Sequence, residues 1–312
     1  KYFKKNAFQP DRDEAYINLV SNQNQTDHIV MKAETSDLVD RLKRAVELRD
    51  LPGMADVDSS LLWFCEQIKN HVTVALSGEC ADEIFGGYPW YYRKEDQERK
   101  GFPWIRSLDE RVSLVRNDLK HLDIESYMLR RYQETVDEAP LLTGEDEAAS
   151  KHRQMLYLNM NWFMQTLLER KDRMSMGASL EVRVPFSDHR IVEYAWNIPW
   201  SMKHHNNQEK GLLRQALRGV LPDKVLFRKK NPYPKTFHPD YTKAVCTWMN
   251  DILSDANAPL FDLFDRERIR KLNDSEGKSI DTPWFGQLMT GPQLIAHLCQ
   301  INYWLKTYRV RL

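Results

Sequence analysis

Apolar residues in the first 90 positions of the chain follow two different spacings. The runs "HIVMK" (28–32) and "VTVALS" (72–77) are short and continuous, and the second is typical of a strand buried on both faces of a parallel sheet. Residues 12–21 and 58–70 instead carry apolar positions at helical spacing. This alternation of strands and helices predicts βαβ units and a parallel sheet.

A further helix is predicted between the two runs, with Ser36 as its N-cap and the segment "DLPGM" (50–54) as its end. After Trp90 almost every segment shows helical spacing, and two apolar stripes are interpreted as core packing. These stripes are Leu156, Met160, Phe163 and Leu167, and Leu294, Leu298, Ile301 and Leu305. The predicted fold class is therefore α/β, with a partial parallel sheet in residues 1–90 and a large, mostly α-helical lobe in residues 91–312.

Composition limits the classes of function. The 312 residues include 45 basic and 45 acidic side chains, and a net charge of zero argues against a broad nucleic-acid surface. No apolar run approaches the roughly 18 residues that span a bilayer. The four cysteines lack CxxC spacing, which favours a reduced, cytoplasmic protein over a disulfide framework or a zinc site. The first residues contain neither an initiating Met nor the apolar core of a signal peptide, so we expect a piece of a longer chain.

The stretch "VALSGECADEIFGGYPW" (74–90) concentrates small and acidic residues directly behind the second predicted strand. Open parallel sheets bind ligands at the carboxyl ends of their strands, which is where Ser77 and Gly78 stand. Gly78 would let a ligand approach the backbone closely, and the helix start that follows would offer N–H groups to an anion. Glu79 and Asp82 follow at once, and a carboxylate there would hold Mg²⁺ or accept a proton. The alternative is an acidic first turn that complements the helix dipole.

The stretch "LSGECADEIFGGY" closely resembles the signature of the asparagine synthase family, whose usual form is SGEG-S-D-E-x-F-G-G-Y. Cys80 and Ala81 replace the middle Gly and Ser of that form. Two further blocks resemble family segments in the same order, namely "RKDRMSMGASLEVRVPFSD" (170–188) and "KGLLRQALRGVLPDKVLFRKK" (210–230), and the region 11–30 is more weakly similar. The resemblance covers essentially the whole chain. It implies a sheet of the adenine nucleotide alpha-hydrolase-like (PP-loop ATPase) type.

Enzymes of this family use ATP and Mg²⁺ to convert a carboxylate to an acyl-adenylate, release pyrophosphate, and let an amine displace AMP. The resemblance therefore implies the C-terminal part of an asparagine synthetase, a ligase that forms β-aspartyl-AMP and amidates it with ammonia derived from glutamine. By the same resemblance, Ser77 and Gly78 would line the ATP or adenylate pocket, and Asp82 would help to hold Mg²⁺. Glu79 would deprotonate the attacking ammonia. Lys230 would stabilise the charge that builds on the α-phosphate.

Several other polar residues are interpreted as structural or surface residues. Lys229 fits a solvated basic patch, and His204 and His205 fit a polar loop. Glu181 and Arg183 are expected to pair inside the protein, because apolar residues flank them. A contact of Arg183 with substrate is the open alternative.

The chain departs from the family pattern in two respects. It contains neither the S-G-G-x-D-S pyrophosphate loop nor the amino-terminal glutaminase domain, so we expect both upstream and expect this chain alone to be inactive. Many asparagine synthetases also carry T-T-x-R before the "SGE" strand, whereas residues 51–60 here contain no Arg. Amidation or cyclisation of another carboxylate, as in β-lactam-synthetase-like and peptide-modifying relatives, therefore stays open, as does a non-catalytic module derived from the fold.

The expected partners follow from this interpretation. They are the small-molecule substrates aspartate, ATP and ammonia, together with the glutaminase domain. A homodimer stays open, and neither nucleic acid nor a membrane is expected.

Overall fold

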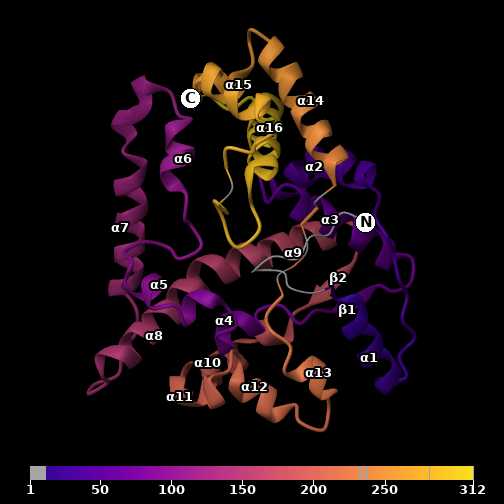
Figure 1. Cartoon of the computed structure of the whole chain (residues 1–312), viewed down its shortest axis with the longest axis vertical. Coiled ribbons are helices and arrows are strands. Elements are labelled where there is room, and N and C mark those ends of the chain that lie inside the picture. The colour runs from indigo at the N-terminus through magenta and orange to yellow at the C-terminus, as the bar shows by residue number, and fades with distance from the viewer. Residues whose placement is uncertain (1–11, 232, 234, 237, 281, 312) are drawn as a thin grey trace.

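The computed structural model describes residues 12–231, 233, 235–236, 238–280 and 282–311. This part of the chain is mixed α/β and mostly helical, with one small parallel sheet (Figure 1). In it, β1 (Val74–Leu76) pairs with β2 (Glu181–Arg183), and the backbone N–H of Ser77 continues the ladder by donating to the carbonyl O of Arg183 (2.9 Å). The predicted α/β class and the parallel strand at 72–77 are confirmed. The prediction that this strand is buried is wrong, because Leu76 is 76% exposed.

Helices make up most of the remaining described residues. Their bounds are α1 Glu14–Asn24, α2 Thr35–Arg49, α3 Asp56–Lys69, α4 Ala81–Phe85, α5 Lys94–Glu98, α6 Leu108–Ser113, α7 Ile124–Asp137, α8 Glu147–Leu158, α9 Gln165–Gly177, α10 His189–Trp196, α11 Trp200–Lys203, α12 Gly211–Ala216, α13 Asp223–Leu226, α14 Pro239–Ser254, α15 Arg266–Asp274 and α16 Gly291–Thr307. The helices predicted at 12–21 and 58–70 correspond to α1 and α3.

The segment before α2 differs from its sequence-based prediction. Residues 28–32 form no strand, and Val30 is exposed, because β1 pairs only with β2 within the described residues and leaves no ladder for this segment to join. The predicted cap is also wrong. Glu34 is the N-cap of α2, and its backbone N–H donates to Oδ2 of Asp37 (2.9 Å) in a capping box that leaves Ser36 inside the first turn.

One long helical rod crosses the molecule (Figure 1). It consists of α8, a π-helical turn (Asn159–Met164) and α9. One part of α9 packs on α2 and α3 around Leu62 and Met174, while the π-helical turn contributes Phe163 to an aromatic cluster with Tyr88 and Trp90. The stripe that includes Leu156 and Phe163 is therefore confirmed as core packing.

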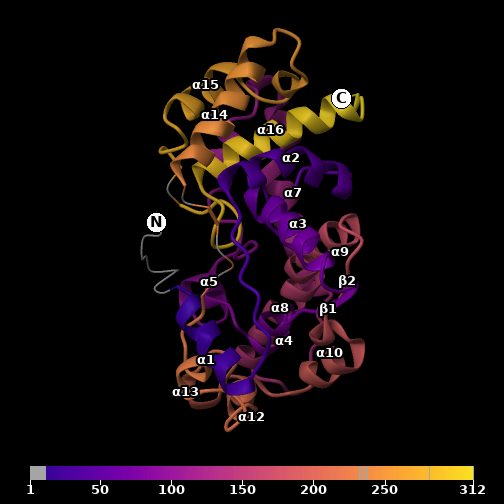
Figure 2. The same ribbon diagram turned by 90° about the vertical axis from the view of Figure 1, so that its right-hand side faces the viewer.

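The carboxy-terminal helices build the largest apolar cluster. There α14 and α16 pack on each other and on α2, and the predicted stripe from Leu294 to Leu305 lies in this core. Figure 2 shows α14, α15 and α16 at one end of the molecule and α1, α12 and α13 at the other. The division of the chain at residue 90 stays a prediction.

The last features of the fold are the length of its helices and the state of its cysteines. Among the described residues, no helix is both long enough and apolar enough to cross a bilayer. The four cysteines are free thiols, and Cys65, Cys80 and Cys299 are buried as small apolar side chains.

Candidate active site

The loop after β1 turns sharply to begin the short helix α4. Cys80, the N-cap of α4, has a left-handed backbone conformation (φ +73°), and Gly86 ends the helix in the same region (φ +71°). The left-handed backbone conformation is sterically costly for a residue with a side chain but not for glycine. This accounts for the Gly that the family signature has where this chain has Cys80. Burial raises the pKa of the Cys80 thiol, so this side chain acts as a packed apolar group.

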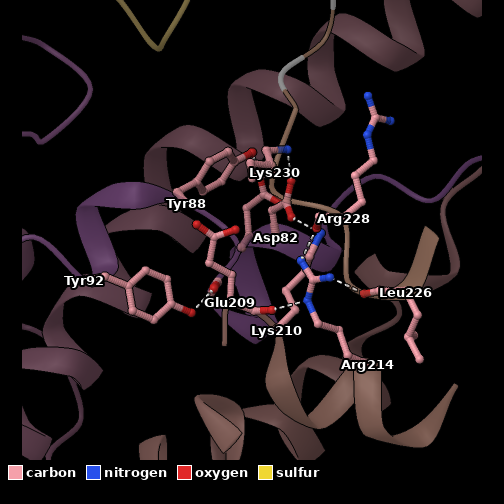
Figure 3. A network of polar contacts seen from close by, with 11 residues as sticks. Asp82, Tyr88, Tyr92, Glu209, Lys210, Arg214, Leu226, Arg228 and Lys230 are labelled. Atoms are coloured by element: carbon pink, nitrogen blue, oxygen red, sulfur yellow. Dashed lines mark hydrogen bonds and ion pairs between the residues drawn. The ribbon is translucent and has the colours of Figure 1, made fainter. Parts of the chain in front are cut away.

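Asp82 lies in α4 and contacts two lysines from distant segments (Figure 3). The Nζ of Lys210 lies 2.5 Å from its Oδ1, and the Nζ of Lys230 contacts its Oδ2. Burial by itself would raise the pKa of Asp82, but the charges of Lys230 and Lys210 hold it well below its usual range. The carboxylate therefore stays ionised between two cations that would otherwise repel each other.

Gly87 makes this position of Asp82 possible. A methyl group built on Gly87 would lie 1.9 Å from Oδ1 of Asp82. The Gly87→Ala variant must therefore displace the carboxylate from Lys210 and Lys230, and we expect it to lower the free energy of unfolding by about 1–3 kcal/mol, measured by urea denaturation. Gly78→Ala is the matched control, since an added methyl group there meets no atom of the described residues within 4 Å apart from its chain neighbours. Equal stability of the two variants would contradict the prediction.

Glu79 is held by cations from the middle of α9. Arg170, which is almost fully buried, donates from Nη2 to Oε1 of Glu79 (2.9 Å). The Nζ of Lys171 lies 3.5 Å from Oε2, and Oε2 accepts no hydrogen bond from the described residues. One oxygen of Glu79 is thus fixed by a charged donor, while the other is buried beside the ammonium group of Lys171.

A cavity of about 330 Å³ brings these groups together at the carboxyl end of β1. Its charged walls include Glu79, Asp82, Arg170 and Lys230, and Phe163 supplies apolar surface. A second cavity of about 790 Å³ adjoins it on the far side of Lys230. The first volume is at the small end of the range for ligand sites.

The structure brings together most of the residues predicted from the sequence. Gly78, Glu79, Asp82 and Lys230 all line the smaller cavity. Ser77 is not among the lining residues, and its backbone N–H is used by the sheet.

Glu83 is buried in the wall of this cavity. The hydroxyl of Tyr88 donates a hydrogen bond to its Oε1 (2.5 Å). Burial, followed by the charge of Asp82, raises the pKa of Glu83 from 4.5 to about 7. The folded state therefore binds this proton more tightly than the unfolded state does. The stabilisation that results is complete below about pH 4.5 and is lost as the pH rises through about 7.

This shift predicts a pH dependence of stability that Glu83→Gln removes. Gln still accepts from Tyr88 but cannot ionise, whereas ionisation costs the wild type on the order of 3 kcal/mol across this range. Urea denaturation of both proteins at about pH 5 and about pH 8 measures the difference. Asp56, whose pKa burial raises to about 6, is present in both proteins and so cancels. An unchanged pH slope in Glu83→Gln would contradict the assignment.

The residues present do not by themselves form a magnesium site. Both oxygens of Asp82 contact ammonium groups, and the part of the chain that the structure describes contains no cluster of three or more His, Cys, Asp or Glu side chains able to hold a metal. Binding of Mg²⁺ by Asp82 would require Lys210 or Lys230 to leave it. Asp82 as a magnesium ligand stays a prediction.

Sequence reasoning assigned no role to three cations at this site. They are Lys210, Arg170 and Lys171, each within or next to a block that resembles a family segment. Their positions in those blocks were the available signal, but the sequence did not indicate which acidic residue each would contact.

Glu181, Arg183 and His204, to which the sequence assigned no catalytic role, lie outside the walls of the smaller cavity. Glu181 and Arg183 pair as expected (2.8 Å), but both are exposed, so the prediction of a pair inside the protein is wrong. They alternate outward on β2, whose residue Val182 packs inward. His204 packs against the ring of Tyr92 in the wall of the larger cavity.

Known proteins resemble this chain over nearly its whole length. A family model described as asparagine synthase matches residues 3–306. A curated relative named asparagine synthetase (glutamine-hydrolyzing) 3, from Bacillus subtilis (strain 168), is 56% identical over 311 residues, which are 99% of this chain and 50% of the relative. The chain thus spans about half the length of that relative.

Two relatives of lower sequence identity carry different names. Asparagine synthetase (glutamine-hydrolyzing) 1 from the same organism is 30% identical over 67% of this chain and 38% of its own length. A protein named amidase chry2, from Gibberella zeae, is 24% identical over 62% of this chain and 36% of its own length.

Proposed function

The chain belongs to the asparagine synthase family, as its motifs predict, and we propose that it is the synthetase portion of a glutamine-hydrolysing asparagine synthetase. The proposed reaction is adenylation of aspartate by ATP to β-aspartyl-AMP, followed by amidation with ammonia derived from glutamine. The observation that carries this proposal is the meeting of Glu79, Asp82 and Lys230 in one cavity at the end of β1. The carboxylate of Glu79 then lies in the same cavity as a cation suited to a phosphate.

In the first step, a carboxylate oxygen of aspartate would attack the α-phosphorus of ATP. The bond from that phosphorus to the bridging oxygen would break and release pyrophosphate. Lys230 would stabilise the charge on the α-phosphate, and Gly78 and Ser77 would lie along the adenylate. Gly78 is exposed, and among the described residues no atom beyond its chain neighbours lies within 4 Å of its Cβ position, which supports a close approach of ligand to backbone. Mg²⁺, entering with ATP, would supply further charge for the phosphates.

In the second step, the nitrogen of ammonia would attack the acyl carbon, and the carbon–oxygen bond to AMP would break. The nitrogen must lose a proton as it becomes an amide, and Glu79 would accept that proton. The position of Glu79 in the cavity wall supports this role, and the bond from Arg170 to Oε1 fixes its carboxylate there.

The remaining parts of the proposed enzyme would lie outside this chain. The glutaminase domain would supply ammonia, and a segment upstream would supply the pyrophosphate loop. The half-length match to the relative from Bacillus subtilis and the exposed side chains of Val74 and Leu76 support this division, because such a strand offers an apolar surface to further sheet. The cytoplasm is the proposed compartment.

The test measures AMP and pyrophosphate released by the complete product of the gene with ATP, Mg²⁺ and ammonium, with and without aspartate. Aspartate-dependent release is the expected result. Release that depends on another carboxylate would replace asparagine synthesis by the related amidating or cyclising activity. If no AMP or pyrophosphate is released with any of the carboxylates tested, the non-catalytic module becomes the better interpretation.

A further inference from the structure

Arg214 contacts both loops that carry the lysines bound to Asp82 (Figure 3). Its Nε donates to the carbonyl O of Glu209 (2.6 Å), and its Nη2 donates to the carbonyl O of Arg228 (2.9 Å). Its Nη1 donates to the carbonyl O of Leu226. One guanidinium group therefore joins the turn before α12 to the segment that follows α13.

The accepting carbonyl groups lie next to the two lysines in sequence. Glu209 shares a peptide group with Lys210, and Arg228 lies two residues before Lys230. Lys210 has a left-handed backbone conformation (φ +53°), which a residue with a side chain adopts only where its surroundings hold it. The contact between Arg214 and Glu209 lies at this strained peptide.

The chemistry of the contacts favours arginine at this position. These three acceptors are neutral carbonyl oxygens at separate points of the backbone, and a planar guanidinium can donate to all of them at once in a fixed geometry. The single ammonium group of a lysine is a point donor and does not match this arrangement. Arg214 itself does not line the smaller cavity, so it acts on that site through the loops.

We propose that Arg214 is a positioning residue for the adenylation step. By holding residues 209–210 and 226–228 on one guanidinium, it fixes the separation at which Lys210 and Lys230 reach opposite oxygens of Asp82. Lys230 is thereby kept in the wall of the cavity. This inference rests on the proposed function of Lys230, and it adds a residue that touches no reacting atom.

The kinetic test uses the complete gene product with Arg214→Met, Arg214→Lys and the control Arg218→Met. Arg218 is an exposed arginine in the same region, and its guanidinium lies over the ring of Phe227. We expect Arg214→Met to lower kcat for aspartate-dependent pyrophosphate release about 10- to 100-fold with little change in KM for aspartate. Arg214→Lys should retain an intermediate rate, and Arg218→Met should match the wild type.

A double variant separates positioning from a general loss of structure. Because Arg214 acts through Lys230, adding Arg214→Met to Lys230→Met should cause no further loss of kcat. A further loss as large as that in the wild-type background would overturn the proposal. If Arg214→Met does not fold, Arg214→Lys serves in the same comparison.

A crystal structure of the Arg214 variant gives a readout independent of activity. Displacement of Lys210 or Lys230 from Asp82 is expected. If both lysines still contact Asp82, the positioning role is overturned, whatever the activity is. If a lysine is displaced and pyrophosphate release is undiminished, the proposed catalytic role of Lys230 is overturned, while the structural assignment of Arg214 is supported.

Discussion

In the complete gene product, Lys230→Met is expected to slow aspartate-dependent pyrophosphate release by about 10²- to 10³-fold. The reason is that Met keeps much of the length and apolar surface of the lysine side chain but removes its positive charge. In the wild type, Nζ of Lys230 lies 5.3 Å from the ring centroid of Tyr88. Asp82 retains Lys210 as a partner, so the carboxylate is not left buried and unpaired. The measurement is the initial rate of pyrophosphate release at saturating ATP and aspartate.

Lys229→Met is the matched control for this prediction. Lys229 is adjacent in sequence, carries the same charge and is exposed, and it lies in the wall of the larger cavity but not in that of the smaller one. Its replacement should leave the rate within about two-fold of the wild type, as is usual for exposed substitutions. Equal losses in the two variants would point to a diffuse effect of charge, and a wild-type rate in Lys230→Met would contradict its assignment to the α-phosphate.

Local sequence was sufficient to predict the strand, the loop and three of the residues that line the cavity, Gly78, Glu79 and Asp82. The apolar run at 72–77 ends where the chain turns, and the motif that follows supplies Glu79 and Asp82 to one end of β1. Lys230 was predicted from its place in a family block. The spacing of the two stripes likewise predicted which faces of α8 and α16 pack in the core.

The partners of these residues could not be predicted, because they come from segments far along the chain. Lys210 and Lys230 lie 128 and 148 residues from Asp82, and Arg170 lies 91 residues from Glu79. No periodicity connects positions at such separations. The pairing was therefore visible only once the fold placed α4, α9 and the segment after α13 around one cavity.

The errors in the fold have a physical cause. An apolar run such as 28–32 shows a preference for strand, but a strand also needs a neighbour to pair with, and pairing is a property of the fold. The same holds for burial, since Leu76 has an apolar side chain at an edge that the described residues leave uncovered. Glu34 became the helix cap in place of Ser36 because a reciprocal capping box with Asp37 satisfies two N–H groups.

Glu79→Gln is expected to separate the two steps of the proposed reaction. Gln can still accept from Arg170 through Oε1, so aspartate-dependent pyrophosphate release in the first turnover, measured with enzyme in excess over ATP, should stay within about ten-fold of the wild type. It cannot take a proton from the attacking nitrogen, so asparagine formation should fall by about 10²- to 10⁴-fold. The ratio of asparagine formed to pyrophosphate released, measured in one reaction mixture with ammonium as the nitrogen source, reports the split directly.

The alternative is that Glu79 only holds Arg170 and Lys171 in place. In that case the substitution would slow both steps alike, and the product ratio in the first turnover would stay near that of the wild type even though both rates fall. Glu181→Gln is the control, because it removes an exposed carboxylate that is already paired with Arg183 and lies outside the cavity walls. A base at the acyl carbon changes the ratio, whereas a structural carboxylate changes only the rates. A constant ratio in Glu79→Gln would therefore assign the proton acceptor to another group.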